Sequence, residues 1–186
     1  LDTLIVIPND RLLQISDKDI KVNEAYLKSD EILSNGVKGI SGLITQPGVI
    51  NVDFADVKTI LKDAGNAVLG IGRSTGEQRA PNAAQAAISS PLLEANMDGA
   101  EGVLITITGS EDLKLQEVNE AARVITERAD DNAEIIFGHT VDPTLGDAVE
   151  VTVVAAGFGP RPNRRIKSDS EINENGGDGL PDFIKG

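Results

Sequence analysis

The chain has 186 residues, 40% hydrophobic and 25% charged, an ordinary composition for one folded domain or one domain with an appendage. It has no cysteine, which excludes disulfide scaffolds, thiolate metal sites and cysteine nucleophiles, and its single histidine, His139, argues against a Ser-His-Asp or multi-histidine metal site. The net charge of -13 repels phosphate backbones, so we expect no nucleic-acid partner. No apolar run approaches the roughly 20 residues of a membrane helix and no signal peptide opens the chain, so we expect a cytoplasmic protein without membrane insertion.

The first predicted element is a buried strand at 4–7, so close to Leu1 that we expect the chain to be the later part of a longer protein. A helix is predicted over 23–45, and Pro47-Gly48 ends it. The inward-facing apolar stripe predicted for this helix consists of Tyr26, Leu33, Val37, Ile40 and Ile44. A second helix is predicted over 53–62, with Gly65 as its carboxyl-terminal cap.

Strands and helices alternate in the rest of the folded part. Strands are predicted at 67–71, 103–108, 134–138 and 148–156, and helices at 81–89 and 117–128. This order predicts a mixed sheet with helices packed on it. After Phe158 the chain becomes polar and rich in glycine, as flexible linkers are, before apolar residues return at 180–185.

The densest polar cluster lies between the first two helices, in the segment 48–56. Asp53 at the N-cap and Asp56 in the first turn would stabilise the start of the second helix. Alternatively, both carboxylates face outward and polarise a water molecule. The two interpretations are compatible, because a capping carboxylate can keep one oxygen free.

Asp30 interrupts the apolar stripe of the long helix, where a carboxylate needs a partner. A structural partner such as a local lysine is one explanation. The other is recognition of a ligand edge with two N–H donors, such as guanine N1 and N2, and Tyr26 one turn earlier could stack on the base.

The segment Gly70-x-Gly72-x-x-x-Gly76 lacks the lysine of a P-loop, which favours a plain turn from strand to loop. We expect His139 to be a partly buried loop residue.

Three long stretches carry a family resemblance: Leu4-Ile-Val-Ile-Pro-Asn-Asp-Arg-Leu-Leu13, Gly48-Val-Ile-Asn-Val-Asp-Phe-Ala-Asp-Val57 and Ala87-Ile-Ser-Ser-Pro-Leu-Leu-Glu94. Two shorter ones agree with it, Gly70-Ile-Gly72 with Gly76-Glu77-x-Arg79-Ala80, and Val151-Thr-Val-Val-Ala155. Together they resemble FtsZ, the prokaryotic tubulin-like cell-division GTPase, over residues 1–158. The resemblance implies an α+β fold: a mixed four-stranded sheet with packed helices, preceded by the last strand of a GTPase domain and a long central helix.

The resemblance also implies half of a GTPase site. In FtsZ, the Gly-x-x-Asn-x-Asp-x-x-Asp loop of one subunit inserts over the GTP of the next, and its two acids position water and cation for hydrolysis. By motif, Asp53 and Asp56 are these catalytic acids, with Asn51 beside them. The cofactors implied are GTP and GDP, with Mg²⁺ in the assembled site, and the motifs assign no metal ligand set within this chain.

Three further residues match nucleotide contacts of the family. Asp30 matches the guanine-binding aspartate. Tyr26 takes the place of the aromatic residue, normally phenylalanine, that stacks on the base. Asn9 matches an asparagine near the nucleotide. The glycine-rich phosphate loop lies outside these residues, so we expect no GTPase activity from this chain alone.

The resemblance divides the chain into five parts: 1–22 ends the nucleotide-binding domain, 23–46 is the central helix, 47–158 the activation domain, 159–179 a flexible linker and 180–186 an interaction peptide. The last resembles the peptide by which FtsZ binds division proteins and membrane tethers, here through Leu180, Pro181, Phe183 and Ile184. The expected self-contact is a head-to-tail filament at the mid-cell division site. The alternatives are a stand-alone module that caps filament ends, and an unrelated acidic α/β domain.

Overall fold

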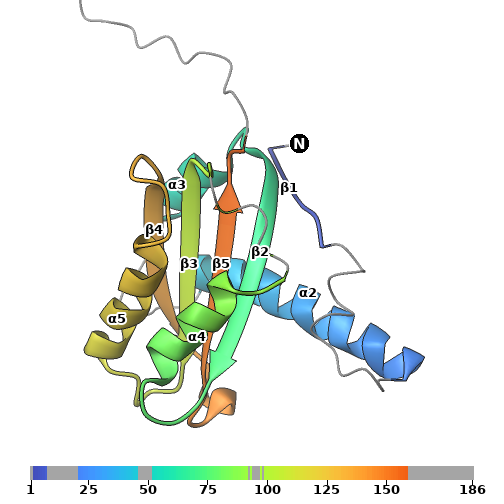
Figure 1. Ribbon diagram of the computed structural model, residues 1–186, viewed down its shortest axis with the longest axis vertical. Helices are drawn as coiled ribbons and strands as arrows, with labels where there is room; N and C mark the ends of the chain where they lie inside the picture. The colour runs from blue at the N-terminus through green and yellow to red at the C-terminus, as the bar shows by residue number, and fades with distance from the viewer. Residues whose placement is uncertain are drawn as a thin grey trace, which may run out of the picture.

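The computed structural model describes residues 2–7, 21–45, 52–91, 93, 97 and 99–158. Within them, five strands form one mixed sheet in the order β1-β2-β5-β3-β4 (Figure 1). Strand β5 is antiparallel to both of its neighbours, β2 and β3, whereas β3 is parallel to β4 and β1 is parallel to β2. The strands are β1 (Thr3–Ile5), β2 (Gly65–Ser74), β3 (Gly102–Gly109), β4 (Glu134–Val141) and β5 (Val149–Ala156).

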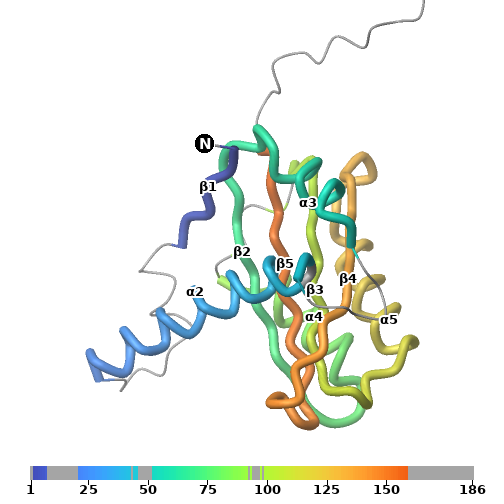
Figure 2. Tube along the Cα trace, turned by 180° about the vertical axis from the view of Figure 1, so that it is seen from behind, coloured from blue at the N-terminus to red at the C-terminus, as the bar shows by residue number. Residues whose placement is uncertain are grey.

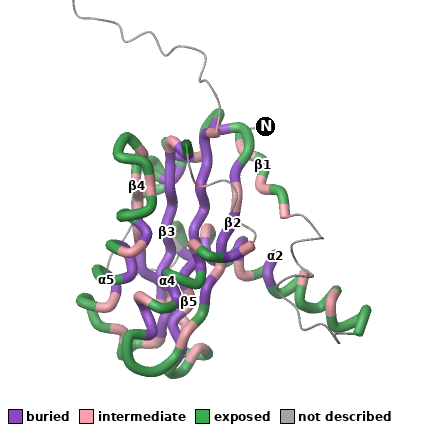
Figure 3. Tube along the Cα trace, in the orientation of Figure 1, coloured by how far each residue is buried: buried purple, intermediate pink, exposed green. Residues whose placement is uncertain are grey.

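The middle of the sheet is apolar on both faces. In β3 and β5 nearly every residue is buried (Figure 3), because helices cover the sheet from both sides and β-branched residues pack well on a pleated surface. Glu150 is the exception in β5, a carboxylate in a run of valine, threonine and alanine. It marks the place where this face of the sheet is not fully covered.

Helices α4 (Arg79–Ile88) and α5 (Leu115–Thr126) cover one face. Helix α4 lies very close to β2: a Cβ added at Gly72 would stand 2.1 Å from the carbonyl oxygen of Ala83. The inner face of α5, including Val118 and Ile125, is buried. Gly70 and Gly72 therefore serve helix packing, in a strand that continues to Ser74 and not only to 71 as predicted. Gly76 follows the strand with φ +81° and open space around it.

Helices α2 (Val22–Thr45) and α3 (Phe54–Leu61) lie on the other face. Figure 2 shows α2 crossing the strands, with its first turns extending beyond the β2 edge. The predicted inward stripe of α2 is wrong at four of its five positions. Ile40 is partly buried against the core, whereas the exposed members are Tyr26, Leu33, Val37 and Ile44. The buried side is Ile32 with Gly36, Gly39 and Gly42. A stripe of glycine carries no hydrophobic signal, so periodicity selected the opposite face.

The element order and the α+β fold class are confirmed. The short strand β1 pairs with Gly65–Ala67 of β2 and adds a fifth strand to the four expected. His139 lies inside β4 and is 4% exposed, so its prediction as a partly buried loop residue was wrong, because β4 extends to Val141. None of the helices in the described ranges is both long and apolar enough to span a bilayer.

Candidate functional site

The start of α3 carries the two predicted catalytic acids. Asp53 is the N-cap residue, with extended backbone (φ -72°, ψ 141°), and its Oδ1 accepts a hydrogen bond of 3.2 Å from the backbone N–H of Ala55. Its carbonyl oxygen accepts from the N–H groups of Asp56 and Val57, at 3.0 and 3.2 Å. The structural interpretation of Asp53 as a helix cap is therefore confirmed.

The capped turn also faces outward. Asp53 and Asp56 are exposed, and Phe54 between them is 58% exposed, while Val52 and Val57 on either side are buried. The buried valines fix the backbone, and the cap fixes the orientation of the Asp53 carboxylate. This turn presents two carboxylates and an aromatic ring, on a rigid base, to whatever lies opposite.

A second group of predicted residues lies near the start of α2. Tyr26 is 69% exposed, and Asp30 is exposed one turn later on the same face, as the i, i+4 spacing requires. Neighbouring Lys28 pairs with Glu31 at 3.2 Å, so the local lysine has a different carboxylate as its partner. The aromatic ring and the carboxylate are both accessible to a ligand.

The structure keeps the two groups apart. The first turns of α2 extend beyond the β2 edge, whereas α3 lies over β3 and β4 (Figure 2). Asp53 and Asp56 share one helical turn, and Tyr26 and Asp30 share another. The other predicted contact residues lie outside the described part of the chain: Asn9, Asn51, Leu180, Pro181, Phe183 and Ile184.

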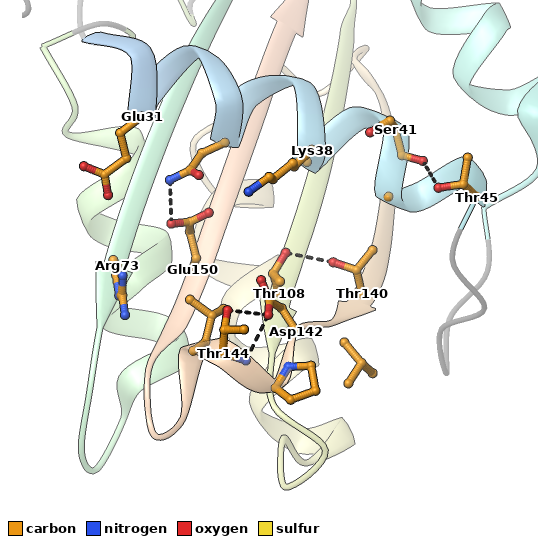
Figure 4. Close-up of a pocket in the computed structure, with 16 residues that line it drawn as sticks. Glu31, Lys38, Ser41, Thr45, Arg73, Thr108, Thr140, Asp142, Thr144 and Glu150 are labelled. Carbon is orange, nitrogen blue, oxygen red and sulfur yellow. Dashed lines mark hydrogen bonds between the residues drawn. The ribbon is translucent and has the colours of Figure 1, made fainter. Parts of the chain in front are cut away.

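Sequence reasoning missed a polar cleft of about 480 Å³ between α2 and the sheet (Figure 4). Its walls carry hydroxyl groups and charges of both signs. Asn35 on α2 donates a 3.2 Å hydrogen bond from Nδ2 to Oε2 of Glu150. The visible signal was Glu150 itself, an acidic residue within a predicted strand of valine, threonine and alanine. The charged residues that line the cleft are Glu31, Lys38, Arg73, Asp142 and Glu150.

Burial is the main influence on Glu150, and it raises the pKa of this carboxyl group. The positive charges of Arg73 and Lys38 act in the opposite direction, while Glu31 and Asp142 reinforce the rise. Asp142 has a lowered pKa instead, because the hydroxyl and backbone N–H of Thr144 donate to its carboxylate.

A buried arginine joins the amino-terminal ends of α4 and α5. Arg79 is 6% exposed and pairs with Glu117 at 2.9 Å and with Asp112 and Asp147 at 3.2 Å each. The hydrogen bond with Glu117 raises the pKa of Arg79 and is the main cause of the lowered pKa of Glu117. This cluster was not predicted, although Arg79 lies in one of the stretches that carry the family resemblance.

The one histidine, His139, is buried in β4. Both ring nitrogens of His139 are buried and without a hydrogen-bond partner in the described part of the protein. Burial lowers the pKa of the imidazole. His139 lies on β4 beside Ile107 of β3, which belongs to the core under α4 and α5. The imidazole therefore lies on the opposite face of the sheet from α2 and α3, which carry Asp30, Asp53 and Asp56.

The described residues contain no group of three histidine or carboxylate side chains that could hold a metal ion. Two exposed carboxylates on one turn suit Mg²⁺ only as part of a larger set, since Mg²⁺ is usually held by one or two carboxylates together with substrate phosphates. Asp53 and Asp56 therefore fit one side of a magnesium–phosphate site, with the other ligands supplied from elsewhere.

The fold is shared with two proteins whose structures were solved as filaments. The chain is similar to the GTPγS-bound protofilament of CetZ2 from Haloferax volcanii, at 18% identity and TM-score 0.61, covering 83% of this chain and 46% of that one. It is also similar to the TubZ-Bt four-stranded filament, at 15% identity and TM-score 0.67, covering 86% of this chain and 43% of that one. At these identities the likeness establishes a shared fold.

Closer matches establish the family. Residues 65–159 match the C-terminal domain of the FtsZ family. The FtsZ of M. jannaschii, in an empty dimer, is 46% identical with TM-score 0.80 over 84% of this chain. The chain therefore belongs to the FtsZ family of tubulin-like, filament-forming proteins. It spans 45% of the length of that M. jannaschii chain.

Proposed function

We propose that this chain is the carboxyl-terminal part of a filament-forming cell-division GTPase. It supplies the acidic turn that activates GTP hydrolysis on the adjacent subunit, and contacts to the guanine base from its long helix. The observation that carries the proposal is the separation of the two exposed groups, Asp53 with Asp56 on α3 and Tyr26 with Asp30 on α2. Groups directed to different parts of the surface suit a site that is completed between subunits.

The chemistry of such a divided site requires little covalent participation by the protein. Phosphoryl transfer depends mainly on positioning and on placing charge, which fixed carboxylates can do. Asp53, oriented by its cap, and Asp56 beside it would orient the attacking water and hold Mg²⁺, which would neutralise charge on the phosphates. Hydrolysis would then depend on assembly, because the acids reach a nucleotide only across a subunit contact.

The long helix supplies the base contacts in this proposal. A carboxylate at Asp30 can accept two N–H groups from guanine, and the exposed ring of Tyr26 can stack on the base. The phosphates are held by the part of the protein that precedes these residues. Residues 1–22 end that nucleotide-binding domain, 47–158 form the activation domain, and 180–186 bind division proteins or membrane tethers at the mid-cell division site.

The test separates catalysis from helix capping. In a complete FtsZ chain that carries this part, Asp53→Asn keeps an N-cap acceptor but removes the charge. We expect GTP turnover to fall at least about a hundredfold, the scale of losing one preorganised electrostatic group, while thermal unfolding stays unchanged. Asp131→Asn, an exposed acid between α5 and β4, is the matched control.

A second arm tests the base contact. Asp30→Ala is expected to weaken GDP binding by about 1–3 kcal/mol, the cost of losing a charge-assisted hydrogen bond, and to leave the acidic turn intact. Normal turnover by Asp53→Asn filaments would contradict the catalytic assignment. Unchanged GDP affinity of Asp30→Ala would return Asp30 to a structural role.

A further inference from the structure

Helix α2 contacts the sheet through a row of glycines, with Ile32 and Ile40 as the apolar side chains that pack beside them. Gly36 lies over Leu69 of β2, Gly39 over Thr152 of β5 and Gly42 over Thr140 of β4, with an added Cβ 2.7, 3.0 and 3.2 Å from the nearest side-chain atom. Glycine surfaces let the backbone approach closely but offer few interlocking side chains to resist sliding or rotation. Ile32 and Ile40 hold α2 on the sheet, and its polar contacts add direction to that packing.

Two polar contacts join α2 to the sheet in the described part of the structure. The hydroxyl of Thr106 on β3 donates a 2.8 Å hydrogen bond to the carbonyl oxygen of Gly39, at the centre of the crossing. The second is the Asn35–Glu150 hydrogen bond, one turn nearer the start of the helix (Figure 4). The central bond by itself would not oppose a pivot of the helix, whereas the second bond, away from the centre, acts with the packing of Ile32 to set its angle.

The charges around Glu150 come from every side of the cleft. Arg73 is directly opposite on β2, Glu31 and Lys38 are on α2, and Asp142 follows β4. Around Glu150, the two positive charges and the two other carboxylates are equal in number, so none of these charges by itself determines the position of α2. The hydrogen bond from Asn35 is the directional contact that distinguishes one helix position from another.

We propose that Asn35 and Glu150 are a positioning pair, whose hydrogen bond sets the angle of α2 on the sheet and thereby the place of Asp30 relative to the acidic turn at Asp53. The inference rests on the proposed function. Asp30 lies five residues before Asn35, about 7.5 Å along the helix, so a pivot at Gly39 moves Asp30 further than Asn35. In a filament, that movement would change where the acids of each subunit meet the nucleotide of the next.

The first test measures the position of α2 directly in the 186-residue chain. The chain has no cysteine, so Leu27→Cys on α2 and Lys58→Cys on α3 allow a pair of spin labels without background. We expect pulsed electron–electron double resonance to show one main distance between the two labels. Asn35→Ala should add a second population, with the ratio of the two shifted about tenfold, as loss of one hydrogen bond to a charged group implies.

Two substitutions at the pair make the test specific. Glu150→Gln keeps an oxygen that can accept from Asn35, so the single distance should remain. Asn35→Asp places two carboxylates together, so the second population should appear at pH 8 and disappear at pH 5, where one carboxyl is protonated and donates to the other. Asn119→Ala, an exposed asparagine on α5, is the matched control.

Each outcome decides the inference. A distance distribution of Asn35→Ala identical to that of Asn119→Ala would overturn it, as would a pH-independent distribution of Asn35→Asp. If Asn35→Ala fails to fold, as judged by circular dichroism, the pH cycle of Asn35→Asp decides alone.

The second test uses a complete FtsZ chain and separates binding from turnover. Asn35→Ala should leave GDP affinity unchanged, because the base contacts remain on α2, and should lower kcat about tenfold. Glu150→Ala should lower kcat in the same way, whereas Glu150→Gln should keep the wild-type kcat. Loss of turnover in Asp53→Asn but not in Asn35→Ala would overturn the positioning pair alone. Full turnover in Asp53→Asn would overturn the proposed function, while the spin-label distances would still report on the pair.

Discussion

The two faces of the sheet are packed in different ways. Under α4 and α5 the core is continuous, and alanines of α4 with 0% exposure lie directly against glycine backbone of β2. Under α2 and α3 the core is smaller, and it gives way to a polar cleft and to apolar side chains that remain exposed on α2. In the described residues one face is covered by packed helices, and the other leaves a cleft and apolar side chains exposed.

Under the proposed function, this difference separates residues that stabilise the fold from residues that act in the site. The predicted base contacts, the acidic turn and the polar cleft all lie with α2 and α3. The buried arginine cluster and His139 lie with α4 and α5. Substitutions on the α4–α5 face should therefore change the free energy of unfolding, and those on the α2–α3 face should change activity first.

The largest effect is expected when a methyl group is added to a glycine on the α4 side of the sheet, compared with a glycine on α2. Gly72→Ala would put Cβ 2.1 Å from the carbonyl oxygen of Ala83 and 2.3 Å from the nitrogen of Ala87, both backbone atoms of α4. The helix would have to move, at a cost of about 3 kcal/mol or more. Gly36→Ala, the control on α2, meets the end of the Leu69 side chain, which can rotate, so we expect less than about 1 kcal/mol.

Urea unfolding of both variants measures this contrast. Equal losses of stability in Gly72→Ala and Gly36→Ala would contradict the distinction between a rigid face and an adaptable one.

An intermediate effect is expected at the arginine cluster. Arg79→Met keeps much of the side-chain length but leaves three carboxylates without their cation. Loss of a buried partner costs about 3–5 kcal/mol, but the side chains of Asp112 and Asp147 are 61% and 70% exposed, so solvent reduces the expected loss to about 2 kcal/mol.

The pH dependence supplies the check on Arg79. Because the pKa of Glu117 is lowered in the folded state, its ionisation stabilises the fold at pH values above the ordinary pKa of 4.5. This contribution is lost as the pH falls through the folded-state pKa. The unfolding free energy of Arg79→Met should therefore fall less between pH 5 and pH 3 than that of the wild type. Parallel curves would show that the ion pairs contribute no stability.

The smallest effect is expected at His139. Its folded-state pKa lies below the ordinary value of 6.5, so the unfolded chain binds the proton more readily and stability falls as pH drops below 6.5. The slope is at most about 1.4 kcal/mol per pH unit. The raised pKa of Glu150 acts in the opposite direction, because protonation of this buried carboxyl favours the folded state at lower pH.

Comparing the wild type with His139→Leu cancels the contribution of Glu150. The difference between their unfolding free energies should change between pH 7.5 and pH 5.5, in favour of the variant at the lower pH. A constant difference would mean that His139 is protonated as easily in the folded state as in the unfolded one.

The order of strands and helices was predictable, because alternating β-branched residues, helical spacing and turn residues are local signals. The cap at Asp53 was predictable for the same reason, since an N-cap involves only residues within the next turn. The Asn35–Glu150 hydrogen bond joins residues 115 positions apart, and the partners of Arg79 lie 33 to 68 positions away. Such pairs leave no spacing pattern in one sequence.

By itself, the sequence determined the fold class, the existence of nearly every element and, through long stretches of resemblance, the family. Only the tertiary structure decided which side of α2 is buried. Hydrophobic periodicity selected the stripe with Leu33 and Val37, whereas the sheet receives the side with Gly36 and Gly39. Close backbone approach depends on the absence of side chains, and periodicity detects only the side chains that are present.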